Sequence, residues 1–220
     1  MNFVTFKYTG SEAIPAEVTL GEHTTPVWIQ QKWEEGQYAE YVRKNGCGHC
    51  CTAMVLNLHG VKIDPHEEFT TCRKLWGEPR KDEPYCEDNF ISAAGSVKIL
   101  RHFGVEAACF GVPAGECDKA AEHIVQSLGE GRQVIIWSHP SPKLPNNPYS
   151  PGEHYILAAG MTEDGRILIA NSSSRAAVND GIQYIDKETI SKILYEGCTP
   201  ADRTWGCYPL NISGGYIVAG

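Results

Sequence analysis

Apolar residues in the first half of the chain recur with the spacing of helices, and glycines mark where those helices end. The run from Cys51 to Leu58 is almost continuously apolar and Gly60 stands just past it, which predicts a buried helix ending there. The same patterns, with polar or capping residues at the start, predict further helices over 32–42, 65–76, 90–103, 116–128 and 187–195.

The second half of the chain has the short, apolar, β-branched runs that are typical of buried strands. Strands are predicted over 3–8, 17–20, 26–29, 105–110, 133–137, 154–160, 166–171, 181–185 and 215–219. The loop over 139–152 separates two of them and holds five prolines, too many for a sheet or helix interior. Helices first and an antiparallel sheet afterwards predict an α+β fold. We expect a single domain over 1–220, with 1–25 as an N-terminal extension or extra strands.

Composition and charge narrow the functional classes. Hydrophobic residues make up 42% of the 220 residues and charged residues 21%, which is ordinary for a soluble globular protein. The formal net charge of −8 argues against nucleic acid or an anionic membrane as the main partner. Residues 1–5 resemble no export signal, and no apolar run approaches the roughly 20 residues of a membrane helix. We therefore expect a cytoplasmic protein, and the sequence leaves its oligomeric state open.

The nine cysteines raise the question of disulfides or zinc. Their number is odd and the chain is long for a disulfide scaffold, which favours reduced thiols. Cys47 and Cys50 have the spacing of a zinc ligand pair, but the next cysteines, Cys72 and Cys86, lie far apart. The spacing therefore predicts no structural zinc site, and we expect neither a metal nor an organic cofactor.

One of these cysteines has the setting of a nucleophile. Cys47 follows a glycine turn and opens the buried helix, where free N–H groups and the helix dipole favour a thiolate. A base is needed within reach, and His154 begins an apolar strand directly after the proline-rich loop. If Gly160 pairs with Arg166 across the predicted hairpin, His154 falls one step from Asn171, whose amide could orient the ring. The register, or a β-bulge, decides whether the two side chains share a face.

An oxyanion would need donors close to the nucleophile. The backbone N–H of Cys47 is one candidate, and a side-chain amide upstream, Gln30 or Gln31, is the other. The residue types alone do not choose between these two glutamines.

These residues carry a resemblance to a known family. The run 46–56, which begins Gly-Cys-Gly-His-Cys-Cys, resembles the cysteine helix of papain-like cysteine peptidases. It is most similar to stand-alone relatives of the double-glycine-leader (bacteriocin-processing) peptidases, and the resemblance extends over 26–175 in the order Gln, Cys, His, Asn. It implies a papain-like fold in which a helical part carries the cysteine and an antiparallel sheet carries the histidine and the asparagine.

The resemblance also implies roles for single residues. Cys47 would be the nucleophile, His154 the base, Asn171 the orienting residue and Gln30 the oxyanion donor of a hydrolase or acyl transferase for peptide or amide bonds. A thiolate–imidazolium pair would form by transfer of the Cys47 proton to His154. Two alternatives stay open: a thiol-disulfide oxidoreductase that uses Cys47 and Cys50, and a catalytically silent binding module on the same fold.

Overall fold

The computed structural model describes residues 3–34, 36, 39–76, 93–138, 143–149, 152, 154–174, 181–194 and 215–220. Its elements, in chain order, are β1 (Val4–Tyr8), β2 (Ala16–Leu20), β3 (His23–Val27), the 3-10 turn η1 (Gln30–Lys32), α1 (Ala39–Asn45), α2 (Cys47–Leu58), α3 (Pro65–Trp76), α4 (Ala93–His102), β4 (Ala107–Phe110), α5 (Cys117–Gly129), β5 (Gln133–Ser138), β6 (His154–Met161), β7 (Ile167–Ala170), β8 (Ile182–Ile185), α6 (Lys187–Ile193) and β9 (Tyr216–Ala219). This arrangement confirms the predicted α+β class.

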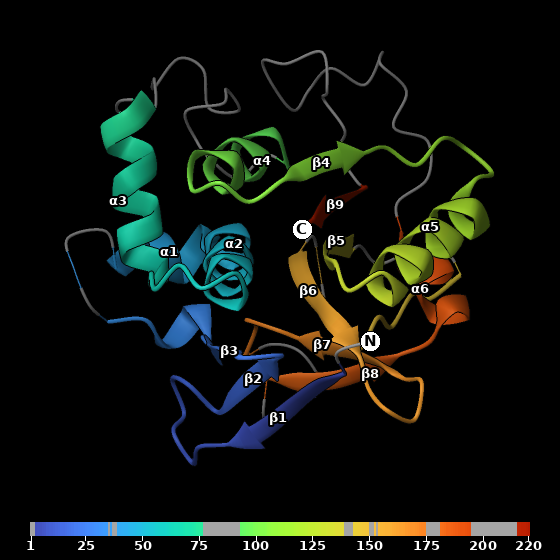
Figure 1. The fold of residues 1–220 in the computed structure, drawn as a ribbon, viewed down its shortest axis with the longest axis horizontal. Coiled ribbons are helices and arrows are strands. Elements are labelled where there is room, and N and C mark those ends of the chain that lie inside the picture. The colour runs from blue at the N-terminus through green and yellow to red at the C-terminus, as the bar shows by residue number, and fades with distance from the viewer. Residues whose placement is uncertain are drawn as a thin grey trace.

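The centre of the fold is a six-stranded antiparallel sheet in the order β4-β9-β5-β6-β7-β8. Helices cover both of its faces, with α2 on one side and the pair α5 and α6 on the other (Figure 1). Successive residues of β6 alternate between the two cores, so that Leu157 packs with α2 and Ile156 packs with α5 and α6. Because both faces are covered, β6 is apolar from Ile156 onward rather than alternating.

A second sheet of three antiparallel strands, β1-β2-β3, is built from the amino-terminal residues. Val4, Val18 and Val27 lie in the same core as α2, which fastens this small sheet beneath the helix. Three strands therefore lie within residues 4–27. The predicted pair over 3–8 and 17–20 is confirmed as β1 and β2, with the register Val4 opposite Leu20.

Helix α2 runs through the interior between α3 and the central sheet (Figure 1). Each residue from Gly48 to Leu58 is buried, which is why the sequence shows an apolar run instead of an amphipathic stripe. Gly60 takes a φ of 84°, a left-handed conformation that glycine adopts without a Cβ clash, and the helix ends there as predicted.

Two predictions about the chain need correction. The predicted helix over 32–42 is wrong at its start, because α1 begins at Ala39 and residues 30–32 form the 3-10 turn η1 instead. The strand predicted over 26–29 ends earlier than expected, because β3 ends at Val27. No helix in the described ranges is both long enough and apolar enough to cross a membrane.

Candidate active site

Cys47 is the first residue of α2, and the turn that presents it allows no side chain. Gly46 is the N-cap, and its N–H donates to the carbonyl oxygen of Val42 in α1. A Cβ added at Gly46 would lie 2.4 Å from that same oxygen, so only glycine permits the close junction of α1 and α2. The two helices therefore meet at one residue, and Cys47 projects from the start of the second.

The environment of the Cys47 thiol differs from the prediction. Burial raises the pKa of this thiol, and the opposing backbone hydrogen bonds, first from Tyr155 and then from Gly48 and Cys47 itself, do not outweigh it. Desolvation of the sulfur therefore opposes the predicted preference for a thiolate at the helix end. The contact with Tyr155 also places Cys47 next to β6 at His154, because Tyr155 directly follows His154 in the chain.

His154 is the first residue of β6, and its side chain is 7% exposed. Its Nε2 lies 2.9 Å from Oδ1 of Asn171, which is 1% exposed and directly follows β7. Burial lowers the pKa of His154 to about 4, and the hydrogen bond to Asn171 opposes this only in part. The imidazole is therefore neutral at pH 7, so the predicted thiolate–imidazolium pair is not the resting state of the site.

A β-bulge brings these two side chains onto one face. Near the hairpin turn Gly160 pairs with Leu168, whereas past the bulge Ala158 pairs with Ile169. Continued beyond β7, this second register sets His154 opposite residue 173, two positions from Asn171 and on the same side of the sheet. The expected pairing of Gly160 with Arg166 is wrong. Without the bulge the observed register would have placed Asn171 on the opposite face.

The orientation of the Asn171 amide is fixed by its neighbours. Its Nδ2 donates to the carbonyl oxygen of Tyr149 at 2.9 Å and to Oε1 of Gln183 at 2.6 Å. Both amide hydrogens are thus used, and Oδ1 must be the atom that faces His154. Because Oδ1 can only accept, His154 carries its proton on Nε2, which leaves Nδ1 as the basic nitrogen.

Gln183 is the residue that the sequence analysis missed. It lies on β8 and is 6% exposed, and its own Nε2 donates to the carbonyl oxygen of Pro148 at 3.1 Å. A polar side chain inside a short apolar strand is the signal that could have identified it. Tyr149 belongs to the proline-rich loop over 139–152, so this loop contributes a carbonyl oxygen to the site.

The structure also separates the two glutamines. Gln31 accepts hydrogen bonds from the backbone N–H and the hydroxyl of Ser174, which engages its side-chain oxygen. Gln30 is 5% exposed, and its Nε2 donates at 3.4 Å to the carbonyl oxygen of Arg43, in α1 just ahead of Cys47. Its backbone N–H donates to Ser172 at 2.8 Å, next to Asn171. Gln30 is thus hydrogen-bonded both to α1, just before Cys47, and to the segment that carries Asn171.

Comparisons with known proteins identify the family of the chain. No curated protein sequence matches the chain. A crystal structure described as that of a C39-like peptidase from Bacillus anthracis is similar to it, with a TM-score of 0.45 and 13% sequence identity, covering 80% of this chain and 88% of that one. The model of the Peptidase_C39 like family matches residues 25–200, which takes in Gln30, Cys47, His154 and Asn171. The predicted resemblance and the papain-like fold are confirmed by this match, and the chain belongs to the Peptidase_C39 like family.

Proposed function

We propose that this chain is a cysteine peptidase in which Cys47 attacks the carbonyl carbon of a peptide bond and His154 is the general base. The observation that carries the proposal is the joint placement of three groups. The Cys47 thiol is hydrogen-bonded by the backbone of Tyr155, the adjacent residue is His154, and Asn171 holds the ring of His154. A nucleophile, a base and a group that orients the base are the three parts this chemistry requires.

The reaction begins from neutral groups. Burial keeps the Cys47 thiol protonated and the His154 ring neutral, so the thiol proton passes to Nδ1 of His154 as the sulfur attacks the substrate. The hydrogen bond from Nε2–H to Asn171 stabilises the imidazolium that this transfer creates. The imidazolium then gives its proton to the leaving amine, and water releases the acyl group from Cys47 by the same route.

The oxyanion of the tetrahedral intermediate needs hydrogen-bond donors. We assign this role to the backbone N–H of Cys47 and to Nε2 of Gln30. One N–H of the Gln30 amide points to Arg43 through a long contact of 3.4 Å, and the second N–H is available for substrate. Gln31 is the poorer candidate because Ser174 holds its Oε1, which fixes the direction of the amide.

The oxidoreductase alternative rests on the Cys47 and Cys50 spacing, and the surrounding elements favour it less. In a thioredoxin-like motif the first cysteine follows a buried strand, whereas here it follows the helix α1. Cys50 is fully buried and burial raises the pKa of its thiol well above the ordinary value, which makes it a slow partner in exchange.

The test is hydrolysis of a library of fluorogenic peptide amides by the full chain and by four variants. Cys47→Ala and His154→Ala should abolish turnover, while Cys109→Ser should retain it, because Cys109 is a half-buried thiol on β4 outside the site. Cys50→Ser distinguishes the alternatives, since a peptidase keeps turnover without Cys50. Reduction of insulin that depends on both Cys47 and Cys50, without peptide hydrolysis, would overturn the proposal in favour of the oxidoreductase.

A further inference from the structure

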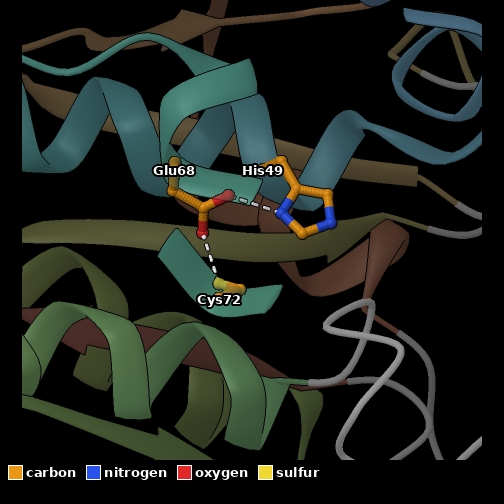
Figure 2. Close-up of side chains that lie close together, drawn as sticks. All are labelled: His49, Glu68 and Cys72. Carbon is orange, nitrogen blue, oxygen red and sulfur yellow. Dashed lines mark hydrogen bonds and ion pairs between the residues drawn. The ribbon is translucent and has the colours of Figure 1, made fainter. Parts of the chain in front are cut away.

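A buried group of three side chains lies between α2 and α3 and has no part in the proposed mechanism. His49 Nδ1 lies 2.5 Å from Oε2 of Glu68, and the thiol of Cys72 donates at 3.6 Å to the other carboxylate oxygen (Figure 2). His49 and Glu68 are each 1% exposed and Cys72 is fully buried. A nitrogen, an oxygen and a sulfur therefore converge in the interior, all within 4.8 Å of one another.

The helices hold these atoms in place from both sides. Glu68 and Cys72 are four residues apart on α3, so they share one face of that helix. His49 reaches them from the first turn of α2, and its ring meets the edge of Phe69 with the ring centroids 4.9 Å apart. The three donors are thus placed by packed helices rather than by a loop, as a preorganised ligand site requires.

We propose that His49, Glu68 and Cys72 form a binding site for a divalent zinc ion. An imidazole nitrogen, a carboxylate oxygen and a thiolate are the ligands that zinc takes in proteins, whereas calcium and magnesium require oxygen ligands. The bound ion would join α3 to the first turn of α2, the helix that begins with Cys47.

The geometry fits after a small adjustment. Zinc–ligand bonds of about 2.0 Å to nitrogen and oxygen and about 2.3 Å to sulfur set tetrahedral ligand atoms roughly 3.3–3.5 Å apart. The Cys72 sulfur lies 3.6 Å from Oε1 of Glu68, whereas the His49 nitrogen lies 2.5 Å from the other oxygen, Oε2, so the carboxylate must rotate to present one oxygen to both ligands. The nitrogen–oxygen pair at 2.5 Å must open by about 0.8 Å, which is the expected change when a metal ion replaces a hydrogen-bonded proton.

Charge supports the same conclusion. Glu68 lies in the interior beside His49, and a buried carboxylate is stable when it is paired, as it is here, or when it coordinates a metal. With neutral His49, ionised Glu68 and ionised Cys72, the two negative charges balance the two positive charges of the ion. Loading therefore releases two protons to solvent, the one held between Nδ1 of His49 and Oε2 of Glu68 and the thiol proton of Cys72, and leaves the buried group electrically neutral. A fourth position of the tetrahedron remains for water or another donor.

The pattern could not be identified from the spacing of cysteines. Zinc knuckles place two ligands within one short turn, and here the ligands come one from α2 and two from α3. The expectation of no metal in this chain was drawn from the separation of Cys72 and Cys86, which has no bearing on a site formed between helices.

The test uses cobalt(II) as a spectroscopic probe of the full chain, which is first reduced and freed of metal by chelation. The protein carries Cys47→Ser so that the proposed nucleophile cannot act as a ligand. We expect one cobalt ion per chain and a thiolate-to-cobalt charge-transfer band, which added zinc removes by competition. The band should disappear with Cys72→Ser and persist with Cys109→Ser. Glu68→Gln should raise the dissociation constant for cobalt at least about tenfold.

Thermal unfolding gives an independent measure. Zinc at about one hundred times its dissociation constant should raise Tm by roughly 5–10 °C in the Cys47→Ser protein and leave the Cys47→Ser, Cys72→Ser protein unchanged. If the folded Cys47→Ser protein shows no charge-transfer band, or if the band persists without Cys72, the proposal is overturned. Neither result bears on peptide hydrolysis, so the two proposals fail separately.

Discussion

Nε2 of His154 lies 2.9 Å from Oδ1 of Asn171, two residues 17 positions apart that a bulged hairpin brings onto one face. The amide of Asn171 is itself held by Tyr149 and Gln183, so its oxygen cannot turn away from the ring. This relationship fixes the tautomer of His154, and most of the expected behaviour of the site follows from it.

Replacement of Asn171 should impair the chemical step. Asn171→Ala removes the acceptor for Nε2–H, and the loosely held ring should lower kcat about 100-fold with little change in KM. Asn171→Asp is the matched control, because its carboxylate still accepts from Nε2 and raises the pKa of His154. Steady-state kinetics across pH should show the acid limb of Asn171→Asp moved to higher pH. An unmoved limb would mean that residue 171 does not act through His154.

Gln183 should act as a positioning residue. Gln183→Leu fills a similar volume but leaves one N–H of Asn171 without its acceptor, which frees the amide to rotate. We expect kcat to fall roughly tenfold or more, since a misoriented base costs rate before it costs binding. Gln183→Glu retains an acceptor and should recover most of the activity. Equal loss in both variants, or a change in KM alone, would contradict this role.

The pH dependence of kcat/KM should be broad. With the pKa of His154 lowered to about 4, the base remains free down to that pH, and the acid limb should fall near pH 4 rather than 6.5. Burial raises the pKa of the Cys47 thiol above its ordinary 9.0, so the basic limb should lie above pH 9. Alkylation of Cys47 by iodoacetamide should correspondingly be slow at pH 5–6 and accelerate toward pH 9. Fast alkylation in acid would show a resting ion pair instead.

The free energy of unfolding should also depend on pH because His154 is buried. Its folded pKa of about 4 lies below the ordinary 6.5, so the unfolded chain binds the proton more readily between these values. The stabilisation is fully present above pH 6.5 and is lost as pH falls toward 4, by up to about 3 kcal/mol. Urea unfolding of the wild type and His154→Gln from pH 7 to 4 measures it. Parallel curves for the two proteins would contradict the prediction.

The two glutamines provide a matched pair for the oxyanion. Gln30→Ala removes the proposed donor and should lower kcat about 100-fold or more with KM nearly unchanged. Gln31→Ala removes an acceptor for Ser174 and should leave kcat within a few-fold of the wild type. If the two substitutions exchange these effects, Gln31 is the donor and the assignment of Gln30 is wrong.

Local patterns in the sequence predicted most of the elements and the residues that could carry chemistry. The apolar run after Cys47 predicts a buried element, and Gly60 ends the helix because glycine takes a left-handed φ without strain. The run 46–56, together with the order Gln30, Cys47, His154, Asn171, indicated the family that the chain belongs to.

Only the tertiary structure decided how these residues meet. One extra residue in β6 moves Asn171 to the face of His154, and bulges leave no mark in an apolar run. Desolvation by the packed core raises the pKa of Cys47 and lowers that of His154. Neither shift could be predicted from the sequence, because burial is a property of the whole fold. The group of His49, Glu68 and Cys72 exists only where α2 and α3 pack, since contact between helices is not encoded in the spacing along either one.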